Sequence, residues 1–137
     1  MIFHVLTLFP EMIREGMNYS IMKRAMDAGS LSVHPVNIRD YTLDKHNKVD
    51  DYPYGGGAGM LMQAQPVYDA YQAVQDTIQK RTGSDSKARV IYVTPQGEVF
   101  QQKKAAELAK ETDLIFLCGH YEGIDERVLE EIVTDYI

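Results

Sequence analysis

Residues 114–127 read Leu114-Ile115-Phe116-Leu117-Cys118-Gly119-His120-Tyr121-Glu122-Gly123-Ile124-Asp125-Glu126-Arg127. Five apolar residues end at a glycine, and acidic residues then precede an apolar pair, which is the order expected of a strand, a turn and a helix. In open α/β sheets, ligands bind at this junction, outside the carboxyl ends of the strands. The two glycines would let the backbone approach a ligand closely. The segment therefore predicts both a fold class and the place of a site.

The same alternation of strands and helices runs through the rest of the 137 residues. Apolar runs predict strands over residues 2–9, 31–38, 90–93 and 114–118, and helical spacing predicts helices from Pro10, from Gln65 and over 105–110 and 124–132. Strands that alternate with helices indicate an α/β fold, a mainly parallel sheet with helices on both faces. Residues 39–59 lack periodicity and are predicted to form a long loop, of the kind that is usually functional or disordered.

Two apolar stripes are predicted to pack in the core. In the first helical stretch the apolar residues that recur at helical spacing are Met12, Ile13, Met17, Ile21, Met22 and Met26. From Gln65 onward they are Val67, Tyr68, Tyr71, Val74 and Ile78. Such stripes more often line a core than a binding surface.

Composition limits the class of protein. Hydrophobic content of 45% and charged content of 25% are ordinary for a globular domain, and no apolar run is long enough to span a membrane. A single cysteine excludes an intramolecular disulfide and favours the cytoplasm. A net charge of −6 argues against a general nucleic-acid-binding protein, although a local basic patch is compatible with it.

Two further segments are candidates for chemistry. Residues 50–60 read Asp50-Asp51-Tyr52-Pro53-Tyr54-Gly55-Gly56-Gly57-Ala58-Gly59-Met60, a backbone-exposed loop that could cradle a planar or anionic ligand. Its spacing is neither that of a Walker loop nor that of a Rossmann fingerprint, and a flexible surface loop is the alternative. Residues 92–97 form a strand end that runs into a proline-containing turn, and an ordinary turn is the alternative there.

The carboxylates of the opening segment allow two interpretations. Glu122 and Asp125 could act as an acid–base pair or as a cation site. Alternatively, acidic residues in a first turn cap a helix, which suits Asp125 and Glu126 better than Glu122. Cys118 and His120 have the wrong spacing and too few companions for zinc.

Five segments, in order along the whole chain, closely resemble the bacterial tRNA (guanine-37-N1)-methyltransferase family of the SPOUT class. They are residues 44–46, 49–51, 54–60, 94–97 and 119–127, and Leu8-Phe9-Pro10-Glu11-Met12 fits as well. The resemblance implies an α/β domain with a trefoil knot in its C-terminal part, followed by a linker and a small helical domain. It also implies a homodimer with no membrane association, which transfers a methyl group from S-adenosylmethionine to N1 of the guanine on the 3′ side of the anticodon of tRNA.

The resemblance also assigns roles to residues. It implies that Glu122 is catalytic and a magnesium ligand, and that His120 stands where the family often has arginine, with a weaker, pH-dependent charge. The cofactor-binding residues that it implies are Tyr92, Val93, Thr94, Pro95, Gly119, Tyr121, Glu122 and Gly123. The residues implied to meet the target guanine are Asp50, Gly55, Gly57, Gly59 and Met60.

Comparison with the family predicts that residues 1–137 are the N-terminal, adenosylmethionine-binding portion of such an enzyme. The knot region is then truncated, and the general base and the tRNA-binding helical domain are expected beyond Ile137. The 137-residue chain alone is therefore predicted to show no turnover and weak cofactor binding. Two alternatives stay open: a non-catalytic binding or dimerisation module, and an unrelated nucleotide-binding α/β enzyme.

Overall fold

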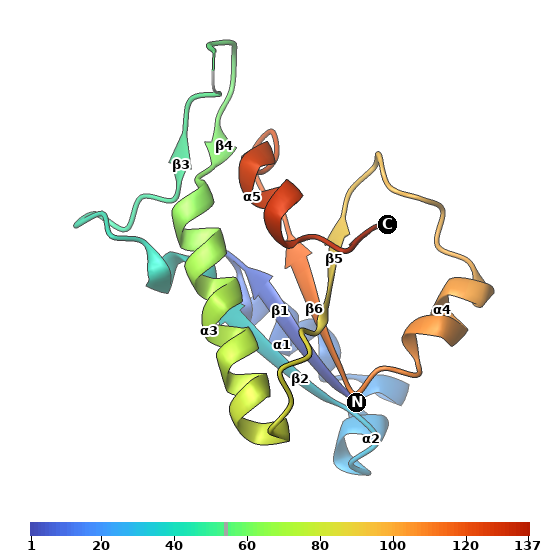
Figure 1. Ribbon diagram of the computed structural model, residues 1–137. Helices are drawn as coiled ribbons and strands as arrows, with labels where there is room; N and C mark the ends of the chain where they lie inside the picture. Colours follow the sequence, from blue (N-terminus) through green and yellow to red (C-terminus); the bar gives the residue numbers. More distant parts are fainter. Residues whose placement is uncertain (54) are drawn as a thin grey trace.

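The computed structural model describes residues 1–53 and 55–137 and contains a five-stranded sheet with only parallel pairings (Figure 1). The strand order is β2-β1-β6-β5-β7, so that the apolar run at 114–118 lies in the middle of the sheet. This confirms the predicted mainly parallel α/β fold. The strands are Ile2–Thr7 (β1), Ser32–Asn37 (β2), Arg89–Val93 (β5), Asp113–Cys118 (β6) and Asp135–Tyr136 (β7).

Helices lie on both faces of the sheet, as predicted (Figure 1). α3 and α5 pack on the face that carries the main apolar core, whereas α4 packs on the opposite face with α1 and α2. None of the helices in the described part of the chain is long and apolar enough to cross a membrane. The helices are Pro10–Met17 (α1), Ser20–Asp27 (α2), Ala64–Thr82 (α3), Gln102–Leu108 (α4) and Glu126–Ile132 (α5), with a short 3-10 helix at Ile38–Tyr41 (η1).

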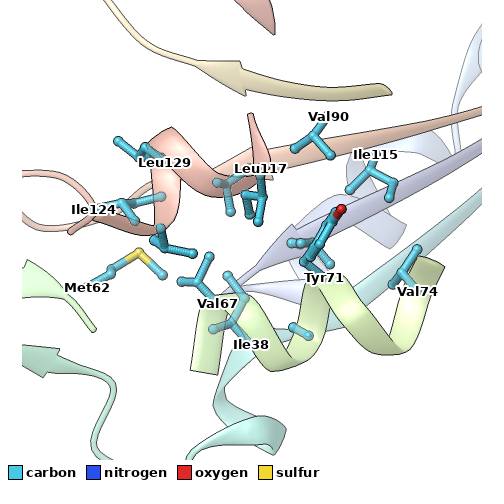
Figure 2. Packing of buried hydrophobic residues seen from close by; sticks show 14 of the residues in the cluster. Ile38, Met62, Val67, Tyr71, Val74, Val90, Ile115, Leu117, Ile124 and Leu129 are labelled. Carbon is cyan, nitrogen blue, oxygen red and sulfur yellow. The ribbon is translucent and has the colours of Figure 1, made fainter. Parts of the chain in front are cut away.

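Alternation along the strands divides the side chains between the two faces. In β6, Ile115 and Leu117 point into the main core with α3 and α5 (Figure 2), whereas Leu114 and Phe116 belong to the smaller cluster under α4. The α3 stripe is confirmed for four of its five members, and Tyr68 is 38% exposed instead. Burial of these apolar side chains is the main favourable contribution to folding.

The predicted burial of the first apolar stripe is wrong. α1 and α2 carry no buried residue, and Met12 and Ile21 are 65% and 70% exposed. Helical spacing was sufficient to predict that these segments are amphipathic helices, because the apolar side chains do lie along one face. It does not say what covers that face.

Three strands of two residues each lie outside the predicted elements. β3 (Asp50–Asp51) and β4 (Leu61–Met62) form an antiparallel pair inside and beyond the predicted long loop. β7 follows α5, which ends at Ile132 near its predicted end, and returns the chain to the sheet beside β5. Both features bring segments to the carboxyl edge of the sheet, where the candidate site lies.

A buried polar cluster stabilises the opposite edge of the sheet. His4 Nε2 lies 2.7 Å from Asp113 Oδ2, and the guanidinium of Arg81, from the end of α3, donates to the same carboxylate oxygen. Burial lowers the pKa of His4, although the hydrogen bond to Asp113 opposes this effect. Burial alone would raise the pKa of Asp113, but the hydrogen bonds from Arg81 and His4 outweigh it and hold that pKa below its usual value.

These shifts predict that the protein loses stability on mild acidification. Because the pKa of His4 is lowered in the folded state, the unfolded chain binds more protons as the pH falls below the ordinary histidine value of 6.5. We expect the melting temperature to fall between pH 7.5 and pH 5.5, and to fall less in His4→Gln. His46→Gln, which changes an exposed histidine that is not among the groups acting on His4, is the matched control and should keep the wild-type dependence. Equal pH dependence in all three proteins would contradict this assignment.

Candidate functional site

The parallel register of β5 and β6 brings the two predicted loop segments together. Val93 and Cys118 are partners at the ends of their strands, so residues 94–97 and 119–123 leave the sheet side by side. Between them lies a cleft of about 520 Å³, within the size range of small-molecule sites. It is lined by all eight residues to which the family resemblance gives a cofactor role: Tyr92, Val93, Thr94, Pro95, Gly119, Tyr121, Glu122 and Gly123.

Gly119 lies against Tyr92 in the lining of the cleft. A Cβ atom there would lie 3.2 Å from the hydroxyl oxygen of Tyr92, so that the tyrosine would have to shift by a few tenths of an ångström. Burial raises the pKa of Tyr92, and the nearby charge of Glu126 adds to the effect. The phenol therefore stays protonated near neutral pH and can donate a hydrogen bond to a ligand.

The backbone that follows is a tight turn with unusual geometry. Tyr121 has a φ of 58° and Gly123 a φ of 142°, and the N–H of Gly123 donates to the carbonyl of His120 at 3.3 Å. An aromatic residue in the left-handed region is uncommon, and such conformations often occur at functional sites. The turn exposes Tyr121 and Glu122 at the edge of the cleft.

Residues 60–62 are hydrogen-bonded along this turn. The N–H of Glu122 donates to the carbonyl of Met60 at 3.0 Å, and the N–H of Met62 donates to the carbonyl of Gly123 at 2.9 Å. Gly59 lies against the Glu122 side chain, because a Cβ built at position 59 would be 2.4 Å from Cγ of Glu122. The glycine-rich segment and residues 119–123, about 60 residues apart in the sequence, therefore lie together at one site.

A second cleft, of about 350 Å³, lies on the other side of Leu61, which lines both. Gly55 lines it together with Asp51, Tyr52 and Arg127. Of the other residues predicted to meet the guanine, Gly59 and Met60 touch Glu122 as described. Asp50 pairs with Met62 in the β3–β4 ladder, and nothing lies within 4 Å of a Cβ built at Gly57. Tyr54, which belongs to the candidate segment at residues 50–60, lies outside the described residues.

The carboxylates of the segment separate into two roles. Asp125 accepts a hydrogen bond from the N–H of Arg127 and caps α5, and its Oδ2 lies 2.6 Å from Nη2 of Arg127. The hydrogen bond from the N–H of Arg127 confirms the capping interpretation for Asp125, and the side-chain hydrogen bonds from Arg127 lower its pKa. Glu126 lies in the first turn of α5, as the capping interpretation expects, and also lines the first cleft. Glu122 lines the same cleft.

The first cleft has an acidic character. No lysine or arginine is among the described residues that line it, and His120 is the one basic side chain there, edge-on to Phe9 at 5.1 Å between ring centroids. A site with carboxylates and without fixed positive charge favours a cationic ligand. Within residues 1–53 and 55–137, no three His, Cys, Asp or Glu side chains gather in a way that could hold a metal ion.

Five residues that line the first cleft have no predicted role there: Leu61, Gln96, Ile124, Glu126 and Leu129. Gln96 and Ile124 lie inside the segments 92–97 and 119–127, and Glu126 is predicted only to cap the following helix. The sequence does not indicate that Leu61 and Leu129 reach the cleft, because their positions depend on how residues 60–62 and α5 fold over the strand ends.

Comparison with known proteins gives a consistent result. The whole chain, residues 1–137, matches the family described as tRNA (Guanine-1)-methyltransferase TrmD. The tRNA (guanine-N(1)-)-methyltransferases of Lachnospira eligens and Lachnoclostridium phytofermentans are 60% and 51% identical to it, and in each case 98% of this chain is aligned. The crystal structure of tRNA (m1G37) methyltransferase from Aquifex aeolicus superimposes on the entire chain with a TM-score of 0.84 at 38% identity.

The chain spans little more than half the length of these proteins: 55% and 56% of the two curated relatives and 58% of the Aquifex aeolicus chain. The family match includes the residues that line both clefts. Because the family description covers every residue from 1 to 137, the chain belongs to the tRNA (guanine-1)-methyltransferase family, TrmD.

Proposed function

We propose that the intact gene product transfers a methyl group from S-adenosylmethionine to N1 of guanine 37 in tRNA, and that residues 1–137 supply most of the cofactor site. One observation carries this proposal: all eight residues with an expected cofactor role line one cleft. The family membership supports the same reaction class. For the 137-residue chain in isolation, the alternative is a non-catalytic binding or dimerisation module, because the relatives are almost twice as long.

The cleft fits S-adenosylmethionine in size and in charge. Tyr92–Pro95 and Gly119–Gly123 would hold it from two sides, with the bare backbone of Gly119 allowing a close approach. When bound, it supplies a methyl group on a positively charged sulfonium. The carboxylates of Glu122 and Glu126 favour this cation over an anionic nucleotide.

Methylation of guanine at N1 requires loss of the N1 proton and stabilisation of the negative charge that develops on O6. The segment from Gly55 to Met60 is the proposed contact for the base, because Gly59 packs on Glu122 at the rim of the cofactor cleft. No residue of the described chain is assigned as the general base. We propose that this base and a tRNA-binding helical domain lie beyond Ile137.

The remaining proposals concern assembly, location and metal. A homodimer would cover the apolar side chains exposed on α1 and α2, such as Met12 and Ile21. The cytoplasm is the proposed location, which agrees with a tRNA substrate and a single unpaired cysteine. Glu122 remains the proposed magnesium ligand, because this ion is often bound through one or two carboxylates and keeps several waters. No step is assigned to that ion.

Methyl transfer from labelled S-adenosylmethionine to tRNA transcripts tests the proposed function. We expect the intact gene product to label a transcript with guanine at position 37 and not one with adenine there. Mass spectrometry of the intact product against its reading frame establishes its length. Equal labelling of both transcripts, or none, would contradict the proposal. Turnover by residues 1–137 alone at a rate near that of the intact protein would contradict the proposed division of roles.

Gly59→Ala is expected to lower the rate of methyl transfer by about tenfold or more, since small misplacements of catalytic groups have effects of this order. An added Cβ would collide with Cγ of Glu122 and move either the loop or the carboxylate. Gly29→Ala is the matched control. Both glycines have positive φ, at 88° and 76°, but nothing lies within 4 Å of a Cβ at position 29, which lines neither described cleft. Equal rates in the two variants would show that the contact with Glu122 is unimportant.

A further inference from the structure

The last strand, β7, is held by a buried carboxylate that has no place in either cleft. Asp135 is 9% exposed and accepts four hydrogen bonds. Nε and Nη2 of Arg89 donate at 3.1 and 2.7 Å, Nζ of Lys104 at 2.8 Å and Oγ1 of Thr134 at 2.6 Å. We call these four residues the Asp135 cluster; it joins β7 to β5 and to α4.

This cluster explains how so short a strand stays in place. β7 has two residues, Asp135 and Tyr136, at the edge of the sheet, and pairs of that length have little stability of their own. The hydrogen bonds from Arg89 lower the pKa of Asp135, so the carboxylate stays ionised and paired at all physiological pH values. A two-nitrogen interaction with arginine also fixes orientation, which a single contact would not do.

β7 in turn holds the first cofactor loop. The N–H of Thr94 donates to the carbonyl of Ile137 at 2.8 Å, and the N–H of Ile137 donates to the carbonyl of Tyr92 at 3.0 Å. Beyond the turn, the N–H of Glu98 donates to the carbonyl of Tyr136 at 2.9 Å. Both ends of the loop at residues 92–97 are thus hydrogen-bonded to residues 136 and 137.

Gly97 shows how close this approach is. A Cβ at position 97 would lie 2.5 Å from the backbone nitrogen and carbonyl carbon of Ile137, a distance at which the backbone itself must move. The conformation of Gly97 does not require glycine, because its φ is not in the left-handed region. The close passage of residue 137 does require it.

We propose that Asp135 and Gly97 are positioning residues for the cofactor: they fix β7 against the loop at residues 92–97 and so set the affinity for S-adenosylmethionine. The inference rests on the proposed function for its ligand. Neither residue lines the cofactor cleft, so any effect of substitution reaches the ligand through β7 and the loop.

The test compares Asp135→Asn and Gly97→Ala with the wild-type intact gene product, well below the melting temperature of each. We expect the KM for S-adenosylmethionine to rise about tenfold in both variants, the order expected from a displaced binding loop, with the KM for tRNA unchanged. Asp135→Glu should recover part of the affinity. Glu107→Gln is the matched control. The Glu107 carboxylate lies 2.8 Å from the same Arg89 but belongs to α4 and not to β7, so its removal should leave the KM for S-adenosylmethionine unchanged.

Hydrogen–deuterium exchange tests whether β7 holds the loop at residues 92–97 without any need for bound cofactor. In Asp135→Asn, the amides of Thr94 and Glu98 should exchange at least severalfold faster than in the wild type and in Glu107→Gln, because their acceptors lie on β7 and residue 137. Unchanged exchange at these amides would overturn the inference even if the protein is an active methyltransferase. Faster exchange in a protein that binds no S-adenosylmethionine would support the positioning of the loop and overturn the proposed ligand.

Discussion

Replacing Glu122 by glutamine is expected to lower the rate of methyl transfer by the intact gene product by about 100-fold or more, the lower range for loss of a group that acts electrostatically in the transition state. Its carboxylate lies at the rim of the proposed cofactor cleft and against Gly59 of the segment proposed to meet guanine. Glutamine has the same shape, so the contact with Gly59 is kept. What is lost is the negative charge next to the reacting groups.

Glu130→Gln is the matched control for this prediction. Glu130 lies on α5, is exposed, and lines neither of the two described clefts, so the same chemical change there should leave the rate unchanged. Single-turnover kinetics at saturating cofactor separate the chemical step from cofactor binding, which Glu122 also serves in our proposal. A single-turnover rate within about threefold of the wild-type value would remove Glu122 from the catalytic group, because loss of a charge that acts in the transition state has a larger effect.

Leu117→Ala is expected to reduce the free energy of unfolding by about 2–5 kcal/mol, the usual cost of a buried leucine truncation. Leu117 has no exposed surface and lies on β6 in the main core, between the sheet and the two helices that cover it (Figure 2). Since whole domains are stable by only about 5–15 kcal/mol, this is a large fraction of the total. The melting temperature should fall by about 10 °C.

Leu43→Ala makes the same chemical change at a residue that is 85% exposed. We expect its stability to stay within about 0.5 kcal/mol of the wild type, as is usual for surface substitutions. Differential scanning fluorimetry of both variants and the wild type, under identical conditions, is sufficient. Equal melting temperatures for the two variants would contradict the placement of Leu117 in the core.

The strands with long apolar runs could be predicted because a strand that is buried on both faces of the sheet appears in the sequence as consecutive apolar residues. β6 is the clearest case: Leu114 and Phe116 serve one face, and Ile115 and Leu117 the other. Once β5 and β6 are adjacent and parallel, their loops must meet at the carboxyl edge. The position of the first cleft could therefore be predicted from the sequence, and the family resemblance gave the expected roles of its residues.

What could not be predicted depends on contacts between distant segments. β7 is two residues long, too short for any periodicity, and it is defined by its pairing with Ile91 and Tyr92. The need for glycine at position 97 arises from the backbone of Ile137, 40 residues later. The apolar face of α1 and α2 is visible in the sequence, but spacing alone does not show whether the same chain covers it.

Nucleoside mass spectrometry, combined with primer extension on tRNA treated with the intact gene product, tests the central claim most directly. A methyl group on N1 removes the hydrogen-bond donor that guanine uses in pairing, so it stops reverse transcription at the modified base. We predict 1-methylguanosine as the product, with a stop at position 37 that is lost in Glu122→Gln and retained in Glu130→Gln. A methyl group on another atom or at another position, or unmodified tRNA after incubation with folded wild-type protein and S-adenosylmethionine, would contradict the account.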